Sequence, residues 1–140
     1  MPLLVVRHAR AGKRREWTGD DRERPLDGRG RRQAAALVDL LSAYPLDRVV
    51  ASGYARCSET LEPLASSRGL EVEAAAELEE GAPRAESLRL LTDLGDRAAL
   101  STHGDVLENL FGEAGQKGST RVVELRDGEA VVLEYLPPPA

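Results

Sequence analysis

The sequence predicts a three-layer α/β fold, in which helices cover both faces of a mostly parallel sheet and an antiparallel C-terminal hairpin lies at an edge. Three observations support this. Short apolar runs alternate with helical segments along the chain, as in proteins with a parallel sheet. The first run, residues 2–6, is continuously apolar, which is typical of a strand buried on both faces. Residues 120–135 form two alternating runs around Asp127-Gly128, which is a strong hairpin signal.

The first strand is followed by a long connection. Residues 11–30 are polar, contain glycine and show no periodicity, so we predict a loop. Loops of this length inside a compact domain are usually functional. Asp27 is a candidate N-cap for a helix over residues 28–43, whose leucines recur at the spacing of one face, and Pro45 closes this helix.

A second short strand is predicted at residues 47–52, after the first helix. The segment 53–69 has a helical pattern and ends at Gly69. Pro63 lies inside it, and because proline lacks a backbone donor we expect a kink or the start of a second helical piece there. Residues 70–74 alternate, which indicates a half-exposed edge strand.

Two helices and a strand precede the hairpin. A helix is predicted over residues 83–95, with Pro83 suited to its first turn and Gly95 to its C-terminal cap. Residues 97–102 form the next strand, and residues 104–113 form the next helix.

Length and composition indicate one domain. The chain has 140 residues, of which 41% are apolar, enough for a hydrophobic core. We predict a single domain over residues 1–136 and a disordered tail at residues 137–140. No apolar run is long enough to cross a bilayer, and the N-terminus lacks the pattern of a signal peptide. The expected location is therefore the cytoplasm, with no membrane partner.

The supply of soft metal ligands is small. Cys57 is the only cysteine and cannot form a disulfide within the chain, and two histidines with one cysteine are a poor ligand set for zinc. We expect no metal and no cofactor. A cysteine-phosphatase loop would need an arginine where Pro63 stands, so we interpret Cys57 as a small buried side chain.

Charge is distributed unevenly along the chain. Residues 1–32 carry ten Lys and Arg against five Asp and Glu, whereas residues 33–140 carry nine against nineteen, and the net charge is −5. Affinity for nucleic acid comes from many clustered cations, and because the chain as a whole is acidic we expect no nucleic-acid partner. A small anion held near the basic N-terminal part fits this distribution better.

Both histidines fall at the carboxyl ends of predicted strands. Arg7 and His8 end the first strand, His103 ends the strand at 97–102, and Arg56 lies in the first turn of the helix after the second strand. In open α/β sheets, ligands bind outside the carboxyl ends of the strands. These four side chains are therefore expected on one rim of the sheet.

This set of side chains suits a phosphoryl group. A guanidinium presents a planar fork of donors that matches phosphate oxygens, and a helix N-terminus adds free backbone N–H groups. A neutral imidazole is a competent nucleophile at pH 7, so one histidine can accept the phosphoryl group. The other histidine and the two arginines can stabilise the phosphoryl oxygens during transfer.

Four stretches, in this order, resemble the motifs of the histidine phosphatase superfamily, which includes the phosphoglycerate mutases: LLVVRHARAG, PLDGRGRRQAAAL, VVASGYARCSETLEPLA and ALSTHGDVL. The chain is most similar to the short single-domain branch, which includes the bacterial phosphohistidine phosphatases and the phosphatase-like domain fused to some Nudix hydrolases. The resemblance implies a phosphoglycerate-mutase-like fold. It also implies that His8 is the phosphorylated nucleophile, and that Arg7, Arg56 and His103 complete the phosphate pocket.

The resemblance also implies a carboxylic acid that protonates the leaving oxygen and later activates water. Glu79 or Glu80 in the stretch AELEEG is the candidate, and Glu77 is less well placed; some short members manage without this acid. Arg10 and Lys13, just beyond His8, are candidate substrate-binding residues. Ala9 stands where larger members typically carry glycine, which argues against mutase activity.

The sequence leaves three functions open. The first is a metal-independent phosphatase that acts on phosphohistidine proteins or small phosphoesters. The second is a nucleotide-directed phosphohydrolase that works with a separate Nudix hydrolase. The third is a non-catalytic module that binds phosphorylated ligands.

Overall fold

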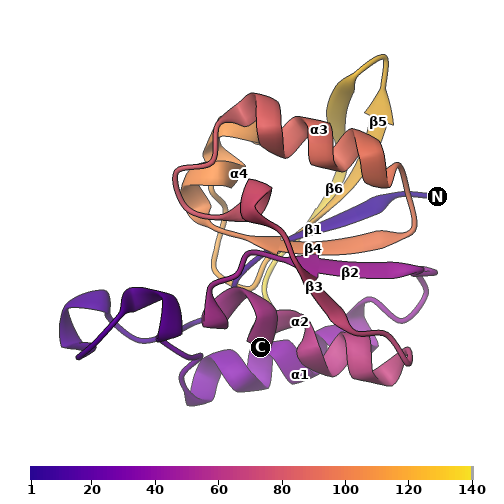
Figure 1. Ribbon diagram of the computed structural model, residues 1–140. Coiled ribbons are helices and arrows are strands. Elements are labelled where there is room, and N and C mark those ends of the chain that lie inside the picture. The colour runs from indigo at the N-terminus through magenta and orange to yellow at the C-terminus, as the bar shows by residue number, and fades with distance from the viewer. Residues whose placement is uncertain (140) are drawn as a thin grey trace.

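A six-stranded sheet runs through the centre of the protein, with helices on both faces (Figure 1). The computed structural model describes residues 1–139. The strands are β1 (Leu3–Arg7), β2 (Arg48–Ala51), β3 (Val72–Ala74), β4 (Ala98–Thr102), β5 (Thr120–Arg126) and β6 (Glu129–Leu136). The helices are α1 (Gly28–Leu40), α2 (Ala55–Ser67), α3 (Arg84–Leu94) and α4 (Gly104–Phe111).

The strand order is β3-β2-β4-β1-β5-β6. The pairs β3-β2, β2-β4 and β4-β1 are parallel, whereas β5 is antiparallel to β1 and β6 to β5. The predicted mostly parallel sheet with an antiparallel edge hairpin is confirmed. Asp127 and Gly128 connect β5 and β6 with φ of 52° and 79°, because a two-residue hairpin turn of this kind needs left-handed backbone at both positions.

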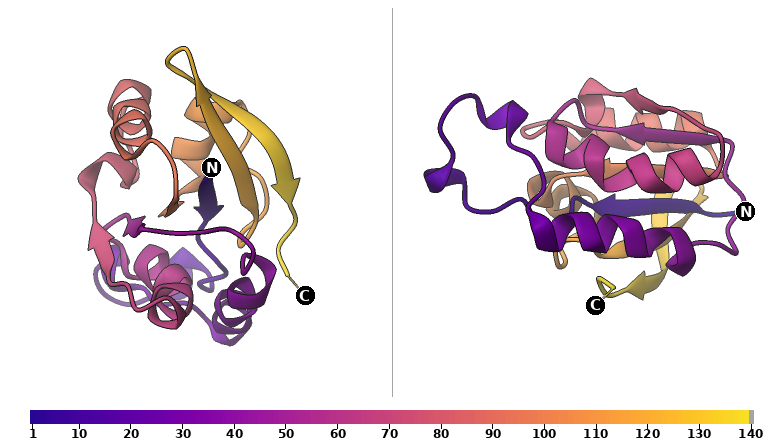
Figure 2. Two further views of the ribbon diagram at one scale, coloured as in Figure 1. Left: turned by 90° about the vertical axis from the view of Figure 1, so that its right-hand side faces the viewer. Right: turned by 90° about the horizontal axis from the view of Figure 1, so that it is seen from below.

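The sheet buries both of its faces. Leu3 and Val5 pack with residues of α3 and α4, and Leu4 and Val6 pack with residues of α1 and α2. Alternate residues of β1 thus enter opposite apolar layers, which explains why this strand is apolar throughout. The left view of Figure 2 shows helices on opposite sides of the sheet, so the predicted three-layer arrangement is confirmed.

Helix boundaries follow local capping. The Asp27 Oδ1 atom accepts a hydrogen bond of 2.7 Å from the Gly30 N–H, which confirms the predicted N-cap of α1. Position 30 requires glycine, because a Cβ there would lie 1.9 Å from the Arg10 carbonyl oxygen. The loop after β1 therefore passes directly over the first turn of α1.

Some details differ from the sequence prediction. α2 continues through Pro63 to Ser67, so the predicted second helical piece is wrong, and the kink at Pro63 stays a prediction. Its buried residues Leu61, Leu64 and Ala65 pack on both sides of the proline, and this packing holds the helix together despite the missing donor. The predicted loop at 11–30 contains two single turns of 3₁₀ helix, at Arg14–Glu16 and Asp21–Glu23.

The C-terminal end follows β6, which ends at Leu136. Residues 137–139 have no regular secondary structure. Ala140, the last residue of the predicted tail at 137–140, lies outside the described residues, and disorder of this tail stays a prediction. Over residues 1–139, no helix is long and apolar enough to cross a membrane.

Candidate active site

The carboxyl ends of β1 and β4 bring the two histidines together. Arg7 pairs with Thr102 in the parallel register, and the His8 N–H donates to the Thr102 carbonyl at 3.1 Å. The next residue after Thr102 is His103, whose ring centroid lies 5.6 Å from that of His8. The helices that follow start at this same edge, so the structure brings the predicted side chains to one rim.

His8 is held in a defined tautomer. Its Nδ1 atom lies 2.8 Å from the Ala9 carbonyl oxygen, and because a carbonyl can only accept, the proton is on Nδ1 and Nε2 keeps its lone pair. Burial lowers the pKa of His8 to about 3; the hydrogen bond to Ala9 opposes this, and nearby His103, Arg56 and Arg7 add to it. The imidazole is therefore neutral at pH 7.

His103 is also neutral and buried. Burial, and next the charge of Arg56, lower its pKa to about 4. Its Nε2 atom lies 2.9 Å from the Ser52 Oγ atom, which also accepts from the Tyr54 N–H. If the Ser52 hydroxyl donates to Nε2, the proton of the ring is on Nδ1, which has no hydrogen-bond partner among the described residues. A phosphoryl oxygen is a suitable acceptor for such a donor.

Arg56 lies at the first turn of α2 and is only 1% exposed. Its guanidinium donates to the Glu80 carboxylate at 2.9 Å and to the Asp21 carbonyl at 3.0 Å, and it lies 3.2 Å from the Asp21 carboxylate. The ring of Tyr54 lies beside it, 4.9 Å from the guanidinium carbon. The Arg56 cation is thus buried at the rim, where α2 carries it and Asp21 of the loop after β1 binds it.

Arg7 is fixed by the loop that precedes β5. Its guanidinium donates to the Gly115 carbonyl at 2.6 Å. A Cβ at Gly104, the first residue of α4, would lie 2.9 Å from the Arg7 Nη2 atom. Glycine at this position leaves room for the guanidinium at the helix start, where free backbone N–H groups and the helix dipole also favour an anion.

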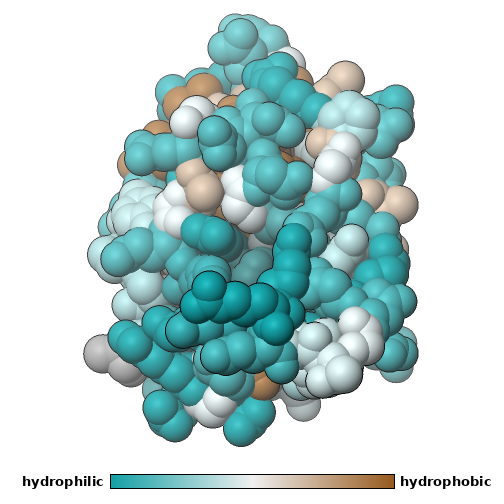
Figure 3. All heavy atoms as spheres, turned by 90° about the vertical axis from the view of Figure 1, so that its left-hand side faces the viewer, coloured by the Kyte–Doolittle hydropathy of each residue, from teal (hydrophilic) through white to brown (hydrophobic). Residues whose placement is uncertain are grey.

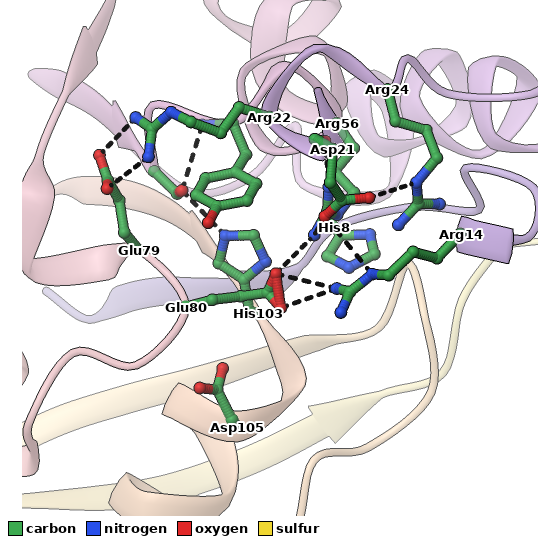
Figure 4. A network of polar contacts seen from close by, with 12 residues as sticks. His8, Arg14, Asp21, Arg22, Arg24, Arg56, Glu79, Glu80, His103 and Asp105 are labelled. Carbon is green, nitrogen blue, oxygen red and sulfur yellow. Dashed lines mark hydrogen bonds and ion pairs between the residues drawn. The ribbon is translucent and has the colours of Figure 1, made fainter. Parts of the chain in front are cut away.

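Glu79 and Glu80 enter different surroundings (Figure 4). Glu80 lines the cavity beside the histidines and binds both Arg56 and Arg14. Glu79 points away and forms a two-bond ion pair with Arg22 at 2.9 and 3.1 Å. That hydrogen bond holds the pKa of Glu79 below its ordinary value. Of the two glutamates, the geometry therefore favours Glu80 for proton transfer.

A cavity of about 690 Å³ lies over these groups. Its lining side chains are mostly cationic, and Figure 3 shows strongly hydrophilic side chains on this side of the molecule. The lining residues are Arg7, His8, Gly12, Lys13, Arg14, Arg15, Arg24, Arg56, Glu80, His103, Gly104, Asp105 and Lys117.

The cavity includes one of the two predicted substrate-binding residues. Lys13 lines it, whereas Arg10 does not and lies 4.0 Å from the Asp27 carboxylate. Four further cations line the cavity and were not among the predicted site residues: Arg14, Arg15, Arg24 and Lys117. Nothing in their local sequence marks them, because side-chain direction in a loop has no periodicity.

Cys57 is fully buried, with its Sγ atom 3.5 Å from the His103 Nε2 atom. Burial raises the pKa of its thiol to about 12. The predicted small buried side chain is confirmed, and the thiol is not ionised at neutral pH. Over residues 1–139, no group of three or more His, Cys, Asp and Glu side chains is arranged to hold a metal ion.

Comparisons with known proteins agree with this architecture. Residues 3–131 match the model of the histidine phosphatase superfamily (branch 1). An 8-oxo-(d)GTP phosphatase from Mycolicibacterium smegmatis is 38% identical over 156 residues, which cover 98% of this chain and 48% of that protein. The chain thus spans about half the length of this relative.

Two solved structures share the fold. The protein histidine phosphatase SixA in complex with tungstate superimposes with a TM-score of 0.81, at 20% identity, over 99% of this chain and 97% of that chain. The alpha-ribazole phosphatase from Shigella flexneri gives a TM-score of 0.75, at 17% identity, over 100% of this chain and 99% of that chain.

Proposed function

Because the chain belongs to the histidine phosphatase superfamily (branch 1), we propose that it is a phosphatase that works through a phosphohistidine at His8. One observation carries this proposal. The hydrogen bond from His8 Nδ1 to the Ala9 carbonyl leaves an unprotonated Nε2 on a buried, neutral ring beside cationic donors. That combination supplies a nucleophile and the charge stabilisation that phosphoryl transfer needs.

The first displacement forms the phosphohistidine. His8 Nε2 attacks phosphorus and the bond from phosphorus to the leaving oxygen breaks. The leaving oxygen takes a proton from Glu80, which has received that proton from the entering phosphate monoanion on displacement from Arg56. Arg7, Arg56 and the Nδ1–H of His103 donate to the phosphoryl oxygens as their charge grows. Arg56 now binds the Glu80 carboxylate at 2.9 Å, and an incoming phosphoryl group would compete for the same donors.

The second displacement releases phosphate. Water attacks the phosphorus, the bond from nitrogen to phosphorus breaks, and the Glu80 carboxylate takes the proton of the water. His8 returns to its neutral form with the proton still on Nδ1. None of these steps uses a metal ion.

The test compares the unchanged protein with the His8→Ala variant on 4-nitrophenyl phosphate, in the presence of a metal chelator. We expect hydrolysis that survives chelation and a loss of at least about 10³-fold in kcat in the variant, since the nucleophile is removed. Rapid acid-free denaturation should trap an alkali-stable phosphoryl group on His8. Turnover that persists in His8→Ala would overturn the proposal, and phosphate binding without any turnover would favour the module that only binds phosphorylated ligands.

A nucleotide substrate is the second candidate. The similarity to the 8-oxo-(d)GTP phosphatase of Mycolicibacterium smegmatis favours this candidate. In this case the chain would work with a separate Nudix hydrolase. Comparing nucleotides with a phosphohistidine protein as substrates, by kcat/KM, distinguishes the two candidates.

A further inference from the structure

The only two lysines of the chain, Lys13 and Lys117, face the same cavity. The other basic residues are all arginine, seventeen of nineteen. Lysine carries a compact charge on a flexible stem, whereas arginine holds a rigid fork. The two flexible cations therefore come from separate loops, one after β1 and one before β5, to a single site.

Neither lysine has a carboxylate partner among residues 1–139. Arg14 and Arg56 are bound to Glu80 and Asp21, and Arg24 is bound to Asp21. The lysines appear in no ion pair and donate no side-chain hydrogen bond within the described part of the chain. Their charge is therefore free to meet a ligand.

The 112–119 loop, which carries Lys117, is tied directly to the catalytic strand. The Gly118 N–H lies 3.0 Å from the carbonyl oxygen of Arg7 and 3.1 Å from that of His8. The Arg7 side chain reaches back to the Gly115 carbonyl at 2.6 Å. The backbone on both sides of Lys117 is thus held against the residues that bind the reacting phosphoryl group.

The hairpin anchors the same loop from its outer side. Arg121 of β5 is 4% exposed and donates to the carbonyl oxygens of Glu113 and Ala114 at 2.7 and 3.3 Å. The Gln116 N–H donates to the Tyr135 hydroxyl of β6 at 3.0 Å. Lys117 is therefore an exposed side chain on a fixed backbone, which is how a binding residue is presented to a ligand.

The electrostatic surroundings of Lys117 favour an anion. Partial burial, and then the charges of Arg7, Arg10, Arg24 and Arg56, lower its pKa. A cation in a positive field is stabilised when a negative group arrives between it and its neighbours.

On these grounds we propose that Lys117, together with Lys13, binds a second phosphate of the substrate, one that is not transferred. Arg7, Arg56 and His103 already suffice for one phosphoryl group, and the two lysines add charge beyond it. The preferred substrate class is then a small molecule with two linked phosphates, such as a nucleoside diphosphate. This inference rests on the proposed function, because it assigns the reacting phosphoryl group to His8.

The first test measures binding and needs no turnover. Methylenediphosphonate has a P–C–P bridge that is not hydrolysed, and methylphosphonate carries one phosphonate group. We expect calorimetry at fixed ionic strength to give tighter binding of methylenediphosphonate to the unchanged protein. Lys117→Gln should weaken the binding of methylenediphosphonate by about tenfold, as expected for the loss of one charge-assisted hydrogen bond. The same variant should weaken the binding of methylphosphonate far less.

Three variants make the comparison specific. Lys117→Arg keeps the charge and should retain most of the preference for two phosphonates, and Lys13→Gln should reduce it. Arg89→Gln removes one positive charge from the exposed face of α3 and should change neither affinity. Equal binding of the two ligands by the unchanged protein, or equal weakening of both by Lys117→Gln, would overturn the inference.

Kinetics then connect the site to turnover. ADP and AMP differ by one phosphate, so Lys117→Gln should lower kcat/KM for ADP much more than for AMP, mainly through KM. A protein that hydrolyses 4-nitrophenyl phosphate through His8 but handles ADP and AMP alike would retain the proposed function and lose this inference. If the protein binds methylenediphosphonate tightly but its phosphatase activity does not depend on His8, the second phosphate site would stand and the proposed function would fall.

Discussion

Glu79 and Glu80 are adjacent in the sequence, but their carboxylates lie in different surroundings. Glu80 faces the cavity and binds two arginines that also belong to it. Glu79 is bound by Arg22 (Figure 4), whose guanidinium carbon lies 4.6 Å from the centre of the Tyr54 ring. Glu79 has extended φ and ψ, and the chain turns at Glu80. This change of direction separates a carboxylate inside the cavity from one that is bound by Arg22.

We expect Glu80→Gln to lower kcat by about 10²-fold or more with an alkyl phosphate, because an alkoxide is a poor leaving group and needs the proton. The loss should be much smaller with 4-nitrophenyl phosphate, whose leaving group is stable as an anion. Glu79→Gln serves as the matched control and should lower kcat no more than about threefold with either substrate. An equal loss with both substrates in Glu80→Gln would instead indicate that Glu80 acts only by positioning Arg56.

The sequence predicted the part of the site that lies at strand ends. His8, His103 and Arg56 follow buried strands, and parallel strands bring such positions to one rim, so their meeting follows from the order of elements. Lys117, Arg14 and Arg24 could not be assigned to the site, and neither could the choice between Glu79 and Glu80 be made. Their directions depend on ion pairs between distant segments, such as Arg14 with Glu80, which no local pattern records.

At the scale of the element, α2 does more than cover the sheet. Thr60, fully buried on this helix, donates its hydroxyl proton to the Arg56 carbonyl at 2.7 Å. The Thr60 Oγ1 atom in turn accepts from the Ala9 N–H at 2.9 Å. The backbone that follows His8 is thus bound to the helix that carries Arg56, which keeps the proposed nucleophile in register with this cation.

We expect Thr60→Val to destabilise the protein by roughly 1–3 kcal/mol, since it leaves the buried Ala9 N–H without a partner. Thr92→Val is the matched control, because the Thr92 hydroxyl also donates one turn back, to the Leu88 carbonyl, but on an exposed face. The control should change the free energy of unfolding by less than about 0.5 kcal/mol. Urea unfolding followed by circular dichroism measures both, and equal effects would mean that the bond to Ala9 contributes nothing.

The order and type of the regular elements were predictable because each has a local signature. Apolar runs gave the buried strands, Asp27 marked the start of α1, and Asp127-Gly128 marked the hairpin. The continuity of α2 through Pro63 was not predictable, since packing of the helix against the sheet outweighs a local preference. The 3₁₀ turns of the loop after β1 (Figure 2) depend on ion pairs of Asp21 with Arg14, Arg24 and Arg56.

At the scale of the whole molecule, the two buried histidines couple stability to pH. Burial lowers their pKa values from 6.5 to about 3 for His8 and about 4 for His103. Below pH 6.5 the unfolded chain takes up protons that the folded protein does not. The stabilising contribution is therefore complete above pH 6.5 and is lost as the pH falls toward 4. Carboxylates with lowered pKa values, such as Asp21 and Glu79, act in the same direction, but only near and below their ordinary values of 3.8 and 4.5.

The window between about pH 5.5 and 6.5 should thus report mainly the histidines, because carboxylates in the unfolded chain are almost fully ionised there, and the chain has no other histidines. We expect the free energy of unfolding to fall with decreasing pH in this window, with a limiting slope of about 2.7 kcal/mol per pH unit for two protons. The double variant His8→Gln/His103→Gln should be nearly flat over the same range. Urea unfolding at a series of pH values measures the slopes, and NMR of the two imidazole rings should show no titration of the folded protein above pH 5. A slope that persists in the double variant, or imidazole rings that titrate near pH 6.5 in the folded protein, would mean that burial does not hold the two histidines neutral. The proposed nucleophile His8 would then be protonated in weak acid, and phosphatase activity should fall as the pH drops below 6.5.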